Sequence, residues 1–257
     1  MKEIAIIFRD KKKDFWNKIS KDVKNVFEDS KVSCFWKNSL KEKNLQNKEL
    51  VISIGGDGTF LSASHFVKNQ IILGINSNKK RSEGALTSES IENLKVKLKK
   101  IKKEKFKVKE YKRVKAKIFQ KDKCILTEYA LNEIYVGNVN PHHTSKYTLL
   151  FKEKEENQVS SGILVSTGTG SGAWYKSMGG KPFSKTKNFL KFIVREPYSR
   201  KIHKTKIKKG KLKENEFLEI KNFFSHNILA IDSIKSYKLK KGDKVVLSIG
   251  KPIKVIQ

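Results

Sequence analysis

The chain is short of the residues that build cross-links, metal cages and membrane spans. Its only cysteines, Cys34 and Cys124, lie far apart and lack the spacing of metal ligands, so a disulfide framework is excluded. The five histidines form no ligand set, and the sequence identifies no metal ligands. Because no apolar run approaches the length of a membrane-spanning helix, we expect a cytoplasmic protein without a membrane partner.

Arginine is also scarce, although the chain is strongly basic. The formal net charge is +31 and the pI is about 10.0, yet only five residues are arginine, so lysine carries nearly all the positive charge. The lysines are spread along the whole chain, whereas bidentate readout of phosphates and guanine edges favours arginine. This distribution argues against a nucleic-acid partner and is compatible with attraction of small polyanions such as nucleotides. A non-enzymatic, basic nucleic-acid-binding protein stays open as an alternative.

The first part of the chain has the pattern of an α/β domain. Apolar runs at 2–8, 32–36, 51–54 and 71–76 predict strands, and amphipathic segments at 14–27, from 59 onward and at 91–101 predict helices. Strands that alternate with helices are typical of a doubly wound parallel sheet. We therefore expect a Rossmann-like domain over residues 1–105.

From about residue 106 the apolar residues return in short alternating runs, which are typical of β-strands. After several such runs up to residue 136, further strands are predicted at 147–151, 162–165, 189–194, 217–220, 228–231, 245–249 and 253–256. We expect residues 106–257 to form a mostly β domain that resembles a β-sandwich. The predicted fold class is therefore α/β plus all-β, with a domain boundary near residue 105.

Three glycines surround one carboxylate where the apolar run 51–54 meets the following helix. The five residues are, in order, Gly55, Gly56, Asp57, Gly58 and Thr59. Glycines let a backbone approach a phosphate closely, and the negative charge of a phosphate suits a helix N-terminus. A carboxylate in such a loop repels bare phosphate, so Asp57 indicates a divalent cation, a proton-accepting role toward a hydroxyl, or both. An ordinary glycine-rich turn with Asp57 as a helix cap is the alternative.

Two further polar features interrupt the β-rich part. Asn132 and Glu133 lie inside the apolar run 131–136, where an amide and a carboxylate are costly to bury without partners. A loop of alternating serine, threonine and glycine spans 166–172 and leads into a helix that runs through Met178. Such a loop offers many small donors to sugar hydroxyls and phosphate oxygens, although a flexible surface loop has the same composition.

In this order and at this spacing, the three motifs resemble those of the NAD kinase family, and the resemblance spans most of the chain. Ser161 followed by glycine, and Gly168 where many bacterial members have proline, are similar to the branch that contains the animal mitochondrial enzyme. The resemblance implies transfer of the ATP γ-phosphoryl group to the adenosine 2′-hydroxyl of NAD, with Mg²⁺ required, by a homodimer or homotetramer. A lipid or sphingoid kinase shares the glycine loop and is the second alternative.

The resemblance also implies roles for individual residues. Asp57 matches the catalytic aspartate that activates the 2′-hydroxyl. The implied phosphate-binding residues are Gly55, Gly56, Gly58, Thr59 and Arg81, and the implied NAD-binding residues are Asn132, Glu133, Ser161, Thr169, Gly172, Ala173, Trp174 and Ser177. Ser161 stands where many members have an acidic NAD contact. Asp232 falls where the family has an Asp-Gly turn, but Ser233 departs from that pattern and Asp232 is not included.

Overall fold

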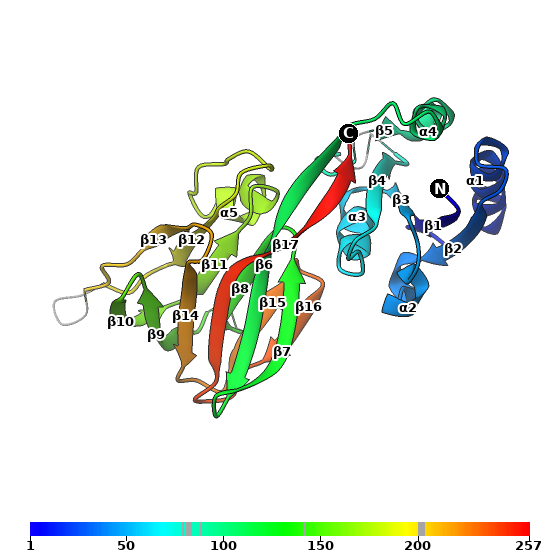
Figure 1. Cartoon of the computed structure of the whole chain (residues 1–257). Coiled ribbons are helices and arrows are strands. Elements are labelled where there is room, and N and C mark those ends of the chain that lie inside the picture. The colour runs from blue at the N-terminus through cyan, green and yellow to red at the C-terminus, as the bar shows by residue number, and fades with distance from the viewer. Residues whose placement is uncertain (79, 81–83, 88, 141, 200–203) are drawn as a thin grey trace. The chain divides into compact units, whose positions relative to one another are not determined.

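The computed structural model describes residues 1–78, 80, 84–87, 89–140, 142–199 and 204–257. The chain divides into two compact units (Figure 1). One comprises Met1–Glu110 together with Ile253–Gln257, and the other comprises Tyr111–Pro252. The last five residues thus belong to the first unit, whereas the sequence pattern places them in the second domain.

The first unit is built around a parallel sheet. Its strands are β1 (Glu3–Phe8), β2 (Lys31–Trp36), β3 (Leu50–Gly55) and β4 (Ile71–Asn76), with the two-residue strand β5 (Glu89–Ser90) beside the end of β4. The strands lie in the order β2-β1-β3-β4, and the end of β17 pairs in parallel with β4. The helices are α1 (Lys13–Val26), α2 (Glu42–Leu45), α3 (Asp57–Ser64) and α4 (Leu94–Lys102), with 3₁₀ turns at Lys37–Ser39 and Ile91–Asn93. This confirms the predicted Rossmann-like architecture.

Burial explains why this segment folds as it does. β1 and β3 are almost completely buried, as expected for central strands of a sheet covered on both faces. α1 buries Ile19, Val23 and Val26, which recur at helical spacing, and it packs against α4. The sheet therefore holds the carboxyl ends of β1, β3 and β4 at one edge, where α/β proteins bind ligands.

The second unit consists of two sheets with apolar side chains between them. One sheet contains β10 (Lys154–Ser160), β9 (Ser145–Phe151), β14 (Phe217–Asn222), β17 (Lys244–Ile256), β6 (Val108–Gln120) and β7 (Lys123–Ala130), in that order. The other contains β13 (Lys209–Leu212), β12 (Leu190–Arg195), β11 (Gly162–Ser166), β8 (Glu133–Asn138), β15 (Asn227–Ile231) and β16 (Lys235–Lys238) and is antiparallel throughout.

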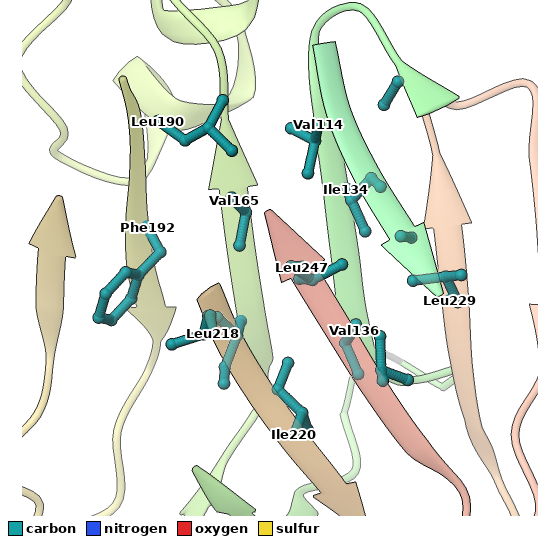
Figure 2. Close-up of a cluster of buried hydrophobic side chains, with 14 of the residues drawn as sticks. Val114, Ile134, Val136, Val165, Leu190, Phe192, Leu218, Ile220, Leu229 and Leu247 are labelled. Carbon is teal, nitrogen blue, oxygen red and sulfur yellow. The ribbon is translucent and has the colours of Figure 1, made fainter. Parts of the chain in front are cut away.

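The core of this unit is drawn in Figure 2. Val136 and Val165 from one sheet meet Leu218, Ile220 and Leu247 from the other, and all five are buried. Burial of such a side chain contributes about 1.5–3 kcal/mol. The arrangement confirms the predicted β-sandwich-like architecture. Among the described residues, no helix is long and apolar enough to cross a membrane.

The structure departs from the predicted strands in two ways. β10, β13 and β16 are polar, lysine-containing strands that no apolar alternation predicts, because each lies at a sheet edge with a solvated side. The runs 245–249 and 253–256 form one strand, β17, because Pro252 keeps a φ compatible with extended backbone. Pro252 lies between the part of β17 that pairs with β14 and the part that pairs with β4.

Candidate functional site

The glycine loop lies at the carboxyl end of β3 and continues into α3. Gly56 is the N-cap of α3, and Asp57 is its first residue. A methyl group at Gly55 would come within 2.2 Å of Thr59 Oγ1 and 3.2 Å of Arg9 Cβ, so only glycine fits between these neighbours. At Gly58, in contrast, no described heavy atom lies within 4 Å of the position of a Cβ.

Asp57 has a fixed orientation. Its Oδ1 accepts a hydrogen bond from the backbone N–H of Leu86 at 2.7 Å, and its Oδ2 accepts one from the N–H of Ala85 at 3.0 Å. The carboxylate therefore joins the first turn of α3 to the segment that follows β4. Thr59 is only 2% exposed, and its side chain packs against Gly55. Arg81 lies outside the described residues.

In the second unit, Asp232 organises the entry into β8. Its carboxylate accepts three backbone N–H groups, from Leu131 at 2.7 Å, Asn132 at 2.8 Å and Glu133 at 3.0 Å. The N–H of Asp232 in turn donates to the carbonyl of Glu133 at 3.1 Å. Asp232 and Ser233 both adopt a positive φ, of 50° and 52°, which forms the tight turn between β15 and β16. The expected Asp-Gly turn is thus made with a serine.

Three buried acceptor atoms of the predicted NAD-binding residues have no hydrogen-bond partner among the described residues. They are Asn132 Oδ1, Glu133 Oε2 and Thr169 Oγ1. Glu133 is 6% exposed, and this burial raises the pKa of its carboxyl to about 8, with a further contribution from the charge of Asp232. Buried polar groups in folded proteins are normally satisfied, so unpaired acceptors grouped in one place indicate a ligand that donates to them.

The threonine- and glycine-rich loop after β11 packs directly on Asn132. Thr167 N donates to Asn132 O at 2.9 Å, and Thr167 Oγ1 donates to Leu131 O at 2.6 Å. A methyl group at Gly170 would lie 2.4 Å from Asn132 O. Ser166 is the register partner of Glu133 across β11 and β8. The structure therefore brings Asn132, Glu133 and Thr169, three of the residues expected to bind NAD, into one region.

The remaining predicted residues lie around the short helix α5 (Trp174–Ser177), which follows a 3₁₀ turn at Gly170–Gly172. The ring of Trp174 packs on that of Tyr135, with centroids 5.0 Å apart. Gly172, Ala173 and Ser177 are exposed. Trp174 and Ser177 line a cavity of about 400 Å³ together with Met178, Val194, Arg195 and Glu196.

Ser161 lies at the opposite end of β11 from the Thr167–Gly170 loop. Its hydroxyl donates to the carboxylate of Glu196, and this bond, with the nearby Arg195, holds the pKa of Glu196 below its usual range. An acidic group is thus present beside Ser161, supplied by the end of β12. Because Asn132 and Glu133 lie at one end of β11 and Ser161 at the other, a ligand that contacts all of them must be extended along the strand.

Comparison with known proteins shows similarity to NAD and NADH kinases. A family model described as the N-terminal domain of ATP-NAD kinase matches residues 4–106. A probable NADH kinase of Oryza sativa subsp. japonica is 28% identical over 234 residues, which make up 81% of this chain and 70% of that protein. An NAD kinase of Clostridium tetani is 36% identical over 145 residues, 55% of this chain and 51% of that protein. The structure of an Archaeoglobus fulgidus NAD kinase in complex with ATP matches with a TM-score of 0.78 at 25% identity, covering 99% of this chain and 93% of that one. The chain is therefore similar to NAD and NADH kinases over most of its length.

These matches agree with the family and the class of enzyme predicted from the sequence, an ATP-dependent kinase that acts on a nicotinamide dinucleotide. The lipid-kinase and nucleic-acid-binding alternatives are not favoured by these matches. The chain spans about half of the clostridial relative and 70% of the rice relative.

Three residues beside the motifs are not among the site residues predicted from the sequence. Asp232 is left out there because Ser233 departs from the family pattern, and Thr167 and Glu196 are not assigned a role. Asp232 and Thr167 position Asn132 and its neighbours through backbone hydrogen bonds, and Glu196 contacts Ser161. Thr167 lies within the serine-, threonine- and glycine-rich loop, and Glu196 closely follows the predicted strand 189–194. The hydroxyl of Thr167 and the carboxylate of Glu196 could therefore have been proposed from the sequence. Asp232 lies 99 residues from Glu133, and only the pairing of β15 with β8 brings them together.

Proposed function

We propose that the protein catalyses transfer of the γ-phosphoryl group of ATP to the 2′-hydroxyl of the adenosine ribose of NAD, giving NADP and ADP. The 2′-oxygen forms a bond to the γ-phosphorus while the bond from that phosphorus to the β–γ bridging oxygen breaks. The proton of the hydroxyl passes to Asp57. The observation that carries the proposal is the set of buried acceptors on Asn132, Glu133 and Thr169 that lack a partner among the described residues, in a chain similar to NAD kinases.

Asp57 is proposed as the proton acceptor. Two backbone N–H groups hold its carboxylate in one orientation, which is the requirement for a positioned general base. Phosphoryl transfer depends mostly on positioning and on neutralising charge, and Gly55, Gly56 and Gly58 leave the backbone open to approach by phosphate oxygens. Thr59 supports the loop, and Arg81 is proposed as a further phosphate-binding residue on the resemblance alone.

Mg²⁺ is proposed as the metal that accompanies ATP. Among the described residues, no group of three or more histidine, cysteine, aspartate or glutamate side chains forms a metal cage. Mg²⁺ is usually held by one or two carboxylates together with substrate phosphates and water, so a single carboxylate such as that of Asp57 fits this mode of binding. When bound, the ion offsets the negative charge of the phosphates.

The NAD contacts are proposed to run along β11. Glu133 and Asn132 accept hydrogen bonds from the ligand at one end, where Thr169 adds a hydroxyl. Gly172, Ala173, Trp174 and Ser177 line the adjoining surface, and the cavity beside Trp174 accommodates one end of the dinucleotide. Ser161, with its hydroxyl bonded to Glu196, is the proposed contact at the far end of the strand.

The deciding experiment is a coupled assay on the purified full chain with ATP, Mg²⁺ and NAD, in which the NADP formed is quantified. NADH in place of NAD, and inorganic polyphosphate in place of ATP, are tested in parallel to identify the preferred acceptor and donor. Diacylglycerol and a sphingoid base serve as control acceptors. Formation of NADP or NADPH without lipid phosphorylation supports the proposal, and phosphorylation of a lipid alone would overturn it.

A cytoplasmic homodimer or homotetramer is proposed on the resemblance to the family. Light scattering coupled to size exclusion, over a range of protein concentrations, measures the oligomeric state directly. A monomer at micromolar concentration would contradict this part of the proposal without affecting the catalytic assignment.

A further inference from the structure

The loop between β1 and α1 forms a cavity at the edge of the parallel sheet where the strand order reverses. β1 lies between β2 and β3, so this edge is the topological switch point of the sheet, the place where α/β proteins bind ligands. A cavity of about 320 Å³ opens here, lined by Phe8, Arg9, Asp10, Lys12, Phe15, Ile54, Ser77 and Asn78. Every residue that lines it belongs to the first unit.

Arg9 connects this cavity to the glycine loop. Its backbone N–H donates to Ile54 O at 3.1 Å, and its Cβ lies 3.2 Å from the position that a Cβ on Gly55 would occupy. Ser77 N donates to Gly55 O at 3.0 Å from the other side. The two loops are thus in direct contact within one unit. Among the described residues, Arg9 and Lys12 are basic residues that line the cavity.

The backbone of the Arg9–Asp10 segment is fixed by two indole groups. Trp36 Nε1 donates to Arg9 O at 3.1 Å, and Trp16 Nε1 donates to Asp10 O at 2.7 Å. Trp16 is itself stacked on Phe8, with ring centroids 4.9 Å apart. The position of Arg9 is therefore determined by the packed end of β1 and not by its side-chain ion pair.

The side chain of Arg9 is available to an anion. Arg9 Nε and one terminal nitrogen donate to Asp10 Oδ2 at 2.9 and 2.8 Å, but the two side chains are 37% and 48% exposed. An exposed ion pair of this kind is weak, so a polyanion can displace the carboxylate at little cost. A guanidinium presents a planar fork that matches the geometry of phosphate oxygens.

We propose that Arg9 is a phosphate-binding residue for the triphosphate of ATP, with Lys12 as a second cation at the same cavity. This inference rests on the proposed function and extends it, because it assigns part of the donor site to the β1–α1 loop beside the glycine loop. The proposed NAD contacts all belong to the second unit, so NAD affinity is not expected to depend on this loop.

The test measures binding of a non-hydrolysable ATP analogue with Mg²⁺, and separately of NAD, by calorimetry on the full chain. Arg9→Gln raises the dissociation constant for the ATP analogue by about 10- to 100-fold, the range for loss of hydrogen bonds to a charged group, and leaves that for NAD unchanged. Lys11→Gln is the matched control. Lys11 carries the same charge in the same loop, but its Nζ lies over the Trp36 ring at 4.1 Å and does not line the cavity. The Lys11→Gln variant changes ATP affinity by no more than about twofold, because the charge that it removes acts on the phosphates only through an electrostatic field that salt screens.

Asp10→Asn separates a charge effect from damage to the loop. This variant retains the backbone carbonyl that Trp16 bonds and releases Arg9 from its ion pair, so the ATP analogue binds as tightly as to the parent or more tightly. Weaker binding by Asp10→Asn, equal losses in Arg9→Gln and Lys11→Gln, or no binding of the analogue to the parent would each overturn the inference. If the parent forms no NADP but binds the analogue in an Arg9-dependent way, the inference stands and the proposed function fails.

Discussion

If Glu133 contacts NAD as proposed, NAD affinity should depend on pH. Because burial raises the pKa of its carboxyl to about 8, roughly nine in ten molecules hold this proton at pH 7. If donors of NAD pair with the ionised carboxylate, binding must expel the proton. NAD affinity then rises by up to about tenfold per pH unit between pH 6 and 8, and on the order of 0.9 proton is released per NAD bound at pH 7. Glu133→Gln cannot ionise, so both effects disappear.

The assay is calorimetric titration of NAD at several pH values in buffers of different ionisation enthalpy, which counts the protons released. Glu128→Gln is the control, because Glu128 is a carboxylate of the same unit whose partners are Lys235 and Tyr237. It should retain the proton release of the parent. An NAD affinity that is constant from pH 6 to 9 in the parent would refute the assignment of Glu133 as an ionising NAD contact.

The stability of the ligand-free protein should change with pH in the opposite direction. The folded state holds the Glu133 proton more tightly than the unfolded state, whose carboxyl has the usual pKa of 4.5. The contribution of this proton to the free energy of unfolding is complete below pH 4.5 and is lost as the pH rises to about 8, on the order of 5 kcal/mol over the whole window. Glu133→Gln should therefore unfold at a higher denaturant concentration than the parent at pH 9 and at a similar one at pH 5.

Three further predictions concern single residues. Asp57→Asn should lower kcat by about 10²- to 10⁴-fold with NAD affinity unchanged, and turnover within threefold of the parent would remove Asp57 from the role of base. Gly170→Ala should lower both stability, by about 1–3 kcal/mol, and NAD affinity, because its methyl group meets the backbone of Asn132, whereas Gly172→Ala should unfold like the parent. Asp232→Asn should cost about 2–3 kcal/mol of unfolding free energy in a urea titration, since an amide oxygen cannot replace both carboxylate oxygens as acceptors; a change below 0.5 kcal/mol, on the scale of ordinary surface substitutions, would contradict that structural role.

Most of the fold follows from the sequence because its central strands are apolar and buried. The predicted strand 71–76 has the bounds of β4, and the run 51–54 lies within β3. The strands that escape prediction, such as β10 and β13, are edge strands whose lysines and glutamates carry no alternation of apolar residues. Their position depends on pairing with neighbours that are distant in sequence, which is information that no local window contains.

The candidate site is predictable where one short segment carries the signal. The glycine loop and the Asn132-Glu133 pair stand out because glycine clusters and polar residues in apolar runs are locally anomalous. Asp232 does not, since its contribution depends on three backbone N–H groups of a strand that precedes it by about a hundred residues. Arg9 is similarly inconspicuous among the many basic residues of the chain, and only its contact with Gly55 distinguishes it.

The unpaired acceptors explain why this part of the fold indicates function more directly than the apolar core does. An unsatisfied buried acceptor costs about 1–3 kcal/mol, and a fold selected for stability alone would replace Asn132, Glu133 or Thr169 with apolar residues or supply partners. Instead, Asp232 and Gly170 fix the backbone of this segment closely, while the side-chain acceptors have no partner among the described residues. The folded protein is therefore destabilised by unsatisfied acceptors on a rigid, preorganised surface. A ligand that donates hydrogen bonds to these three atoms removes that destabilisation when it binds. This coupling predicts that a given concentration of NAD raises the free energy of unfolding of the parent by more than it raises that of the Glu133→Ala variant.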